Sequence, residues 1–166
     1  MQLTTAARTG ALEADAGSWR ARARARRKAL EADREQTWTL PGYEGVLEVT
    51  YRRLRTEDVH AVLSSVEIPS MNERYAQFLI DATVGIYGLE PDGTRTPLEH
   101  GRPLGWDEIA RAANPDTTAP SLRAAVLEVF DALEGNNDHD LREHGDEVYR
   151  WTKRLNAAAA EVVAGE

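Results

Sequence analysis

The chain contains no cysteine, and this absence excludes three kinds of chemistry. A protein without thiols forms no disulfides, has no thiolate nucleophile and offers no zinc–thiolate site. The same absence fits a reducing, intracellular setting. Lysine is also scarce, and neither Lys28 nor Lys153 lies in a glycine-rich phosphate loop.

Long apolar runs are missing as well. No stretch approaches the ~20 apolar residues of a membrane span, and the start of the chain lacks the apolar core of a signal peptide. We therefore expect no membrane association and a location in the cytoplasm. The 166 residues are long enough for one domain that buries its own core.

The charge is acidic and unevenly placed. The net charge is −8, and residues 1–89 are balanced, with 12 charges of each sign. Residues 90–166 carry 16 Asp and Glu against 8 Lys and Arg, so this half holds the whole excess. Such a surface makes nucleic acid an unlikely partner and favours solubility or a basic protein partner.

One segment near the N-terminus runs against this acidity. Residues 1–17 are small and polar, and we expect them to be flexible. Residues 18–36 alternate Ala and Arg, which predicts a helix because both are strong helix formers. Its basic side chains are those of Arg20, Arg22, Arg24, Arg26, Arg27 and Lys28. We interpret it as a solvated helix whose arginines pair with nearby acids; a basic arm for nucleic acid or an acidic partner is the alternative.

The rest of the chain, residues 37–166, is predicted to be a single globular domain. Alternating apolar residues and a Pro-Gly turn predict a small antiparallel β-hairpin near residues 37–54. Apolar spacings of three and four predict a central helix over 70–87, in which Ser70 is the N-cap. Further helices are expected over 56–66, 106–113, 121–134 and 140–163. The predicted fold class is α+β, mostly α, with five or six helices.

No catalytic or metal-binding constellation is recognisable in the sequence. The stretch from Asn136 to Glu147 spaces its oxygen side chains like a calcium loop, but Leu141 and Glu143 occupy positions that need glycine and an apolar residue. His144 lies four residues after Asp140, a spacing typical of a surface helix pair. We predict no metal, no cofactor, no catalytic residues and no enzymatic activity.

Two segments invite a binding role. Residues 106–130 read as helix, turn, helix, which suggests a DNA-binding regulator, but the turn is long and the second helix offers little positive charge. The last two helices carry an apolar stripe, which we interpret as a partner-binding surface. Its predicted members are Phe130, Leu133, Trp151 and Leu155. On this hypothesis Trp151→Ala weakens partner binding more than it lowers stability; the alternative is that Trp151 belongs to the core.

The order of these features resembles a known family. An Arg-rich leader precedes TWTLPGYEGVLEVTYRRL and FLIDATVGIYG, and an Asp-Gly turn, WDEIARAA, SLRAAVLEVF and a final helix with VYRW follow. This succession, over residues 37–151, resembles the tail assembly chaperones of siphoviruses that infect actinobacteria. The resemblance implies a non-enzymatic helical protein that binds the tape measure protein during tail assembly in the infected host. The alternative is a virion component, either a head–tail connector or a capsid-associated protein.

Overall fold

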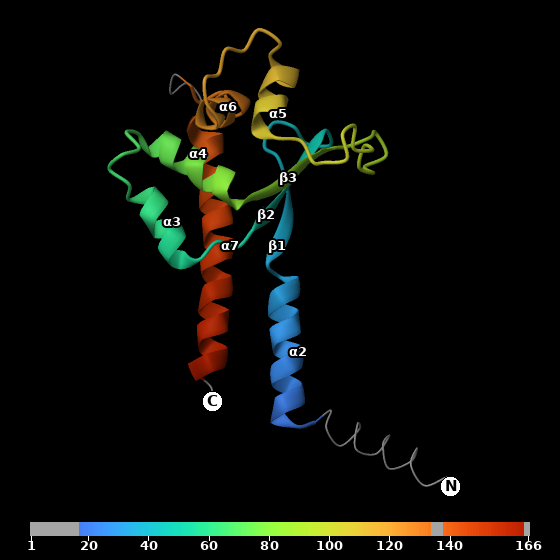
Figure 1. The fold of residues 1–166 in the computed structure, drawn as a ribbon, viewed down its shortest axis with the longest axis vertical. Helices are drawn as coiled ribbons and strands as arrows, with labels where there is room; N and C mark the ends of the chain where they lie inside the picture. Colours follow the sequence, from blue (N-terminus) through green and yellow to red (C-terminus); the bar gives the residue numbers. More distant parts are fainter. Residues whose placement is uncertain (1–16, 134–137, 165–166) are drawn as a thin grey trace. The chain divides into compact units, whose positions relative to one another are not determined.

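The computed structural model describes residues 17–133 and 138–164, with side chains up to Lys153 apart from that of residue 32. The expected flexible segment 1–17 lies almost wholly outside this part. The chain divides into two units, Met1–Arg34 and Glu35–Glu166. The described residues form six helices and a three-stranded antiparallel sheet, which confirms the mostly helical α+β fold (Figure 1).

The first unit contains one described helix, α2 (Trp19–Ala32). The Ser18 hydroxyl oxygen caps it by accepting a 3.2 Å hydrogen bond from the Ala21 amide. The predicted helix over 18–36 is therefore too long at its C-terminal end. Glu35 and Gln36 belong instead to the first strand, where they pair with Arg52 and Tyr51.

The sheet consists of β1 (Glu35–Thr39), β2 (Leu47–Arg52) and β3 (Thr83–Gly88), with β2 in the centre. The predicted hairpin is present as β1 and β2. As expected, Leu47, Val49 and Tyr51 of β2 are buried. This pattern explains why a short sheet is stable here, because one face of it packs against the helices.

The third strand corrects the predicted helix over 70–87. That helix, α4 (Met71–Ala82), ends five residues early, and the chain continues as β3 beside β2. The sequence TVGIYG is rich in β-branched and aromatic residues, which favour a strand. Gly85 also allows close approach of the loop that follows, because a Cβ there would lie 2.4 Å from the Pro103 Cβ.

Four further helices complete the second unit. They are α3 (Thr56–Leu63), α5 (Trp106–Ala113), α6 (Leu122–Val129) and α7 (Asp138–Ala164). Helix α4 packs against α3, α6 and α7, and α5 packs against α6 (Figure 1). The fully buried side chains of Phe78 and Leu79 place α4 at the centre of one continuous core.

Candidate functional site

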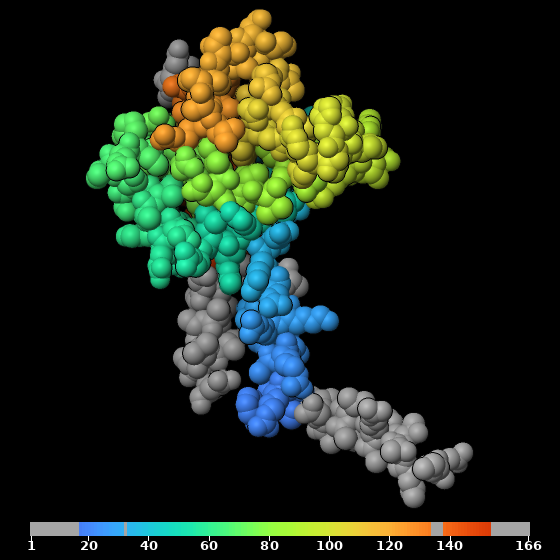
Figure 2. Space-filling view, viewed as in Figure 1, coloured from blue at the N-terminus to red at the C-terminus, as the bar shows by residue number. Residues whose placement is uncertain are grey.

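The candidate site is a hollow between the start of α4 and helix α6, which we call the α4–α6 groove. Its volume is about 500 Å³. On the face shown in Figure 2, the segments of α4 and α6 lie next to each other. The groove is lined by Ser70, Asn72, Glu73, Pro120, Ser121, Ala124, Leu127, Ala132 and Leu133.

The two sides of the groove are two helix N-termini. The Ser70 hydroxyl oxygen caps α4 by accepting from the Glu73 amide, and Ser121 caps α6 by accepting from the Ala124 amide, both at 3.2 Å. The Ser70 hydroxyl also donates to the Glu73 carboxylate at 3.0 Å. These rim hydroxyls therefore serve as helix caps, the most favourable use of serine at a helix start.

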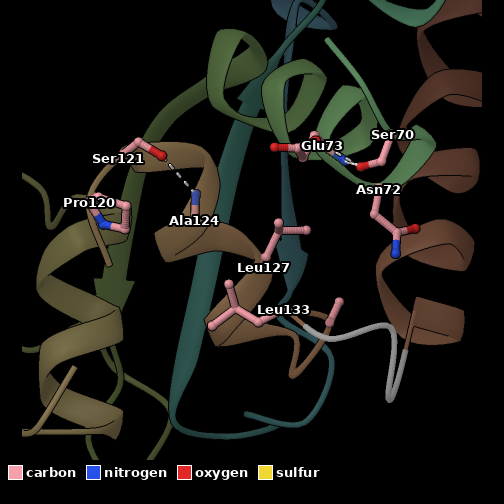
Figure 3. A pocket seen from close by; sticks show the side chains of 9 residues that line it. Ser70, Asn72, Glu73, Pro120, Ser121, Ala124, Leu127 and Leu133 are labelled. Carbon is pink, nitrogen blue, oxygen red and sulfur yellow. Dashed lines mark hydrogen bonds between the residues drawn. The ribbon is translucent and has the colours of Figure 1, made fainter. Parts of the chain in front are cut away.

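The floor of the groove comes from α6 and the turn after it. Asp131 adopts a positive φ of 55°, and the Ala132 amide donates to the Leu127 carbonyl at 2.7 Å. This helix end reverses the chain and brings Leu133 to the groove that Leu127 also lines. In the view of Figure 3, both leucines lie between the Ser121 side and the Ser70 side. The Leu133 side chain is 51% exposed, so it is available for contact.

Helix α7 supports the rim of the groove. The Arg142 guanidinium donates to the Asn72 side-chain oxygen at 3.0 Å and pairs with the Asp138 carboxylate at 3.1 Å. The Asn72 side of the groove is thus held by a side chain that is 70 residues away in the sequence.

The predicted partner surface is corrected by the structure. Phe130 and Trp151 are buried in the core, with Trp151 only 8% exposed, so neither provides an exposed contact. Their apolar stripe faces the protein interior because it packs against other aromatic rings; the ring of Trp151 lies 6.2 Å from that of Trp38. Leu133 alone of the described members is exposed. The Leu155 side chain lies outside the described part.

The expected position of His144 on the surface is wrong. The spacing from Asp140 suggested a surface pair, but the His144 side chain is buried and its Nε2 shares a 2.9 Å hydrogen bond with the Tyr51 hydroxyl. The rings of Phe130 and Trp38 lie 5.7 and 6.1 Å away. Burial among these rings lowers the pKa of His144 to about 4, because an imidazolium would lose its hydration there.

The possible calcium loop does not form in the described residues. Residues 138–147 belong to α7, so they form a helix rather than the loop that the calcium pattern requires. His139 pairs with Glu143 at 3.3 Å, and Asp138 pairs with Arg142. Asn136 lies outside the described part.

The helix-turn-helix reading concerns α5 and α6. Their connection is tied to α6, since the Glu128 carboxylate accepts a 2.7 Å hydrogen bond from the Asn114 side-chain Nδ2 and another from the Thr117 hydroxyl. Arg111 of α5 pairs with Asp107 at 3.1 Å. Helices α5 and α6 therefore offer few positive charges that could bind the phosphates of DNA.

The basic helix α2 exposes its arginine and lysine side chains. Arg27 pairs with Glu31 at 3.2 Å, in line with the expected pairing to nearby acids. The Arg20 guanidinium lies 4.6 Å from the centre of the Trp19 ring, which is itself 60% exposed.

Comparison with family models, with curated proteins and with solved structures found no match. Among the described helices, none is long and apolar enough to span a bilayer. The groove was missed from the sequence because it depends on two helix starts that are 51 residues apart. The sequence predicted Ser70 as an N-cap and a helix start after Pro120, but it did not predict that these two helix starts lie side by side.

Proposed function

We propose that this chain is a non-enzymatic tail assembly chaperone of a phage, and that the α4–α6 groove holds a segment of the tape measure protein. The order of sequence elements supports the family. The groove supports the mode of action, because the Ser70 and Ser121 hydroxyls at its rim are engaged in helix caps while apolar side chains line its floor. Folded domains bind amphipathic helices through apolar side chains in a groove, and here Leu127 and Leu133 are those side chains.

The observation that carries this proposal is the exposure of Leu133 beside Leu127. An apolar side chain that is half exposed at the mouth of a pocket gains contact area when a partner covers it. Leu133 is also one of the residues of the partner-binding surface that the sequence predicted. The chaperone would act in the cytoplasm of the infected bacterium, where tails assemble.

The test is co-expression of the full chain with the tape measure protein, followed by purification through a tag on the chain. We expect the two proteins to co-purify. Leu133→Ser should reduce the yield of the complex about tenfold, as expected when a central apolar contact worth ~1.4 kcal/mol is lost. Val66→Ser is the matched control, because Val66 is 90% exposed and does not line the groove.

A second measurement separates a chaperone from a virion component. Mass spectrometry of purified particles and of the lysate should detect the chain in the lysate and not in particles. Stoichiometric presence in particles would favour the alternative of a head–tail connector or capsid-associated protein.

A further inference from the structure

The walls of the α4–α6 groove carry negative charge without positive charge. A second hollow of about 230 Å³ adjoins it, and the two share Pro120 and Leu133 as lining residues. We call both hollows together the extended groove. Its acidic lining residues are Glu73, Asp116 and Glu128, and no lysine or arginine lines either hollow.

Two of these three carboxylates accept hydrogen bonds from neutral donors. Glu73 accepts from the Ser70 hydroxyl, and Glu128 accepts from Asn114 and Thr117. Within the described part of the chain, none of the three forms an ion pair, and Arg142 beside Asn72 is neutralised by Asp138. The negative charge at the extended groove is therefore not cancelled locally.

The surrounding unit has the same sign. Residues 35–166 contain 12 Lys and Arg against 24 Asp and Glu, a net charge of −12. A ligand that enters the groove with positive charge gains from the local carboxylates and from this wider field, whereas an acidic ligand is repelled.

We infer that the extended groove selects a basic amphipathic helix, in which an apolar side chain packs on Leu133 and flanking lysines or arginines face Glu73, Asp116 and Glu128. A helix is the fitting ligand because the groove runs between two helices and offers capped helix ends rather than an open strand edge. This inference rests on the proposed function and specifies which segment of the partner is bound.

The test uses the full chain and three labelled synthetic peptides. The first has a leucine stripe flanked by lysines, the second has the same stripe flanked by glutamates, and the third is a scrambled lysine peptide without a stripe. Fluorescence anisotropy measures the affinity of each. We expect the first peptide to bind at least about tenfold more tightly than either of the others.

Two variants locate the binding. Leu133→Ser should weaken binding of the striped lysine peptide about tenfold, and the Glu73→Gln/Asp116→Asn/Glu128→Gln triple variant should weaken it to a similar extent, because it removes the three negative charges that face the lysines. Each amide keeps one acceptor oxygen, so Glu73→Gln can still accept from the Ser70 hydroxyl, whereas Glu128→Gln keeps one of the two hydrogen bonds that Glu128 accepts. A triple variant with the same change in charge, Glu57→Gln/Glu67→Gln/Glu99→Gln, lies outside both hollows and should bind normally.

Each contrary result identifies a different error. Equal binding of the striped lysine and glutamate peptides overturns the charge preference, and equal binding of the scrambled peptide shows general attraction to an acidic protein. A dimer of the free chain that dissociates on Leu133→Ser would place a second copy in the groove and overturn the inference. If the lysine peptide binds as expected but the tape measure protein does not co-purify, the proposed partner is wrong and the groove's preference stands.

Discussion

Helices α2 and α4 are of similar length, 14 and 12 residues, but they are stabilised in different ways. The described side chains of α2 are exposed or half-buried, and its recorded contacts are local ones such as Arg27 with Glu31. Helix α4 buries Phe78 and Leu79 completely. The first depends on propensity and capping, and the second on tertiary packing.

This contrast teaches what each kind of sequence signal can predict. Composition predicted that α2 is a helix, because Ala and Arg are strong helix formers, but not that it ends at Ala32. For α4 the apolar spacing predicted the helix but not its end at Ala82. The four predictions below test the difference between the buried unit and the exposed helix, from the largest effect to the smallest.

The largest effect is expected from Trp151→Ala. This side chain is buried against Trp38, so its removal leaves a cavity and should lower the free energy of unfolding by ~3–5 kcal/mol. Denaturant unfolding of the full chain, followed by circular dichroism, measures it. A loss below ~1 kcal/mol would return Trp151 to the role of a surface contact.

The second effect is a loss of stability in mild acid. Because the pKa of His144 is about 4 in the folded protein and near 6.5 unfolded, only the unfolded state binds this proton between those values. The contribution is complete above pH 6.5 and falls as the pH drops towards 4. Between pH 7 and pH 5 the free energy of unfolding should fall by about 2 kcal/mol.

The control removes both partners of the buried hydrogen bond. The Tyr51→Phe/His144→Leu variant leaves no buried polar atom from this pair and should show a much smaller decrease between pH 7 and pH 5. The range stops at pH 5 because Arg102 lowers the pKa of Glu108 below its usual 4.5, so that this carboxylate contributes at lower pH. An unchanged slope in the double variant would show that His144 is not the group responsible.

The sequence predicted where the helices lie in the chain better than it predicted where they end or which of them pack together. Residues 106–113 were predicted as a helix and form α5 with the same bounds. The change from α4 to β3 at Thr83 was missed because Ile86 and Tyr87 continue the helical spacing, and only pairing with β2 makes them a strand. The groove depends on contacts between α4 and α6, and the burial of His144 depends on Tyr51, 93 residues away; neither leaves a local signal.

A third, smaller effect should be stabilising. The Thr152 hydroxyl is buried without a hydrogen-bond partner in the described structure. Thr152→Val replaces it with a methyl group of similar shape, and removing an unsatisfied polar atom should raise the free energy of unfolding by ~1 kcal/mol. Unfolding in urea measures the gain, with Thr118→Val, at an exposed position, as the comparison. A destabilised Thr152→Val protein would indicate that the hydroxyl has a partner in solution.

The smallest effect is expected at Trp19, the aromatic residue of α2. Trp19→Ala removes a side chain that is 60% exposed and contacts Arg20, and alanine has the higher helix propensity. The free energy of unfolding should therefore stay within ~0.5 kcal/mol of the parent, and the helical circular dichroism signal should not fall. A loss above ~1 kcal/mol would mean that Trp19 is packed in solution. Helix α2 would then be stabilised in the same way as α4, and the distinction between the two helices would fail.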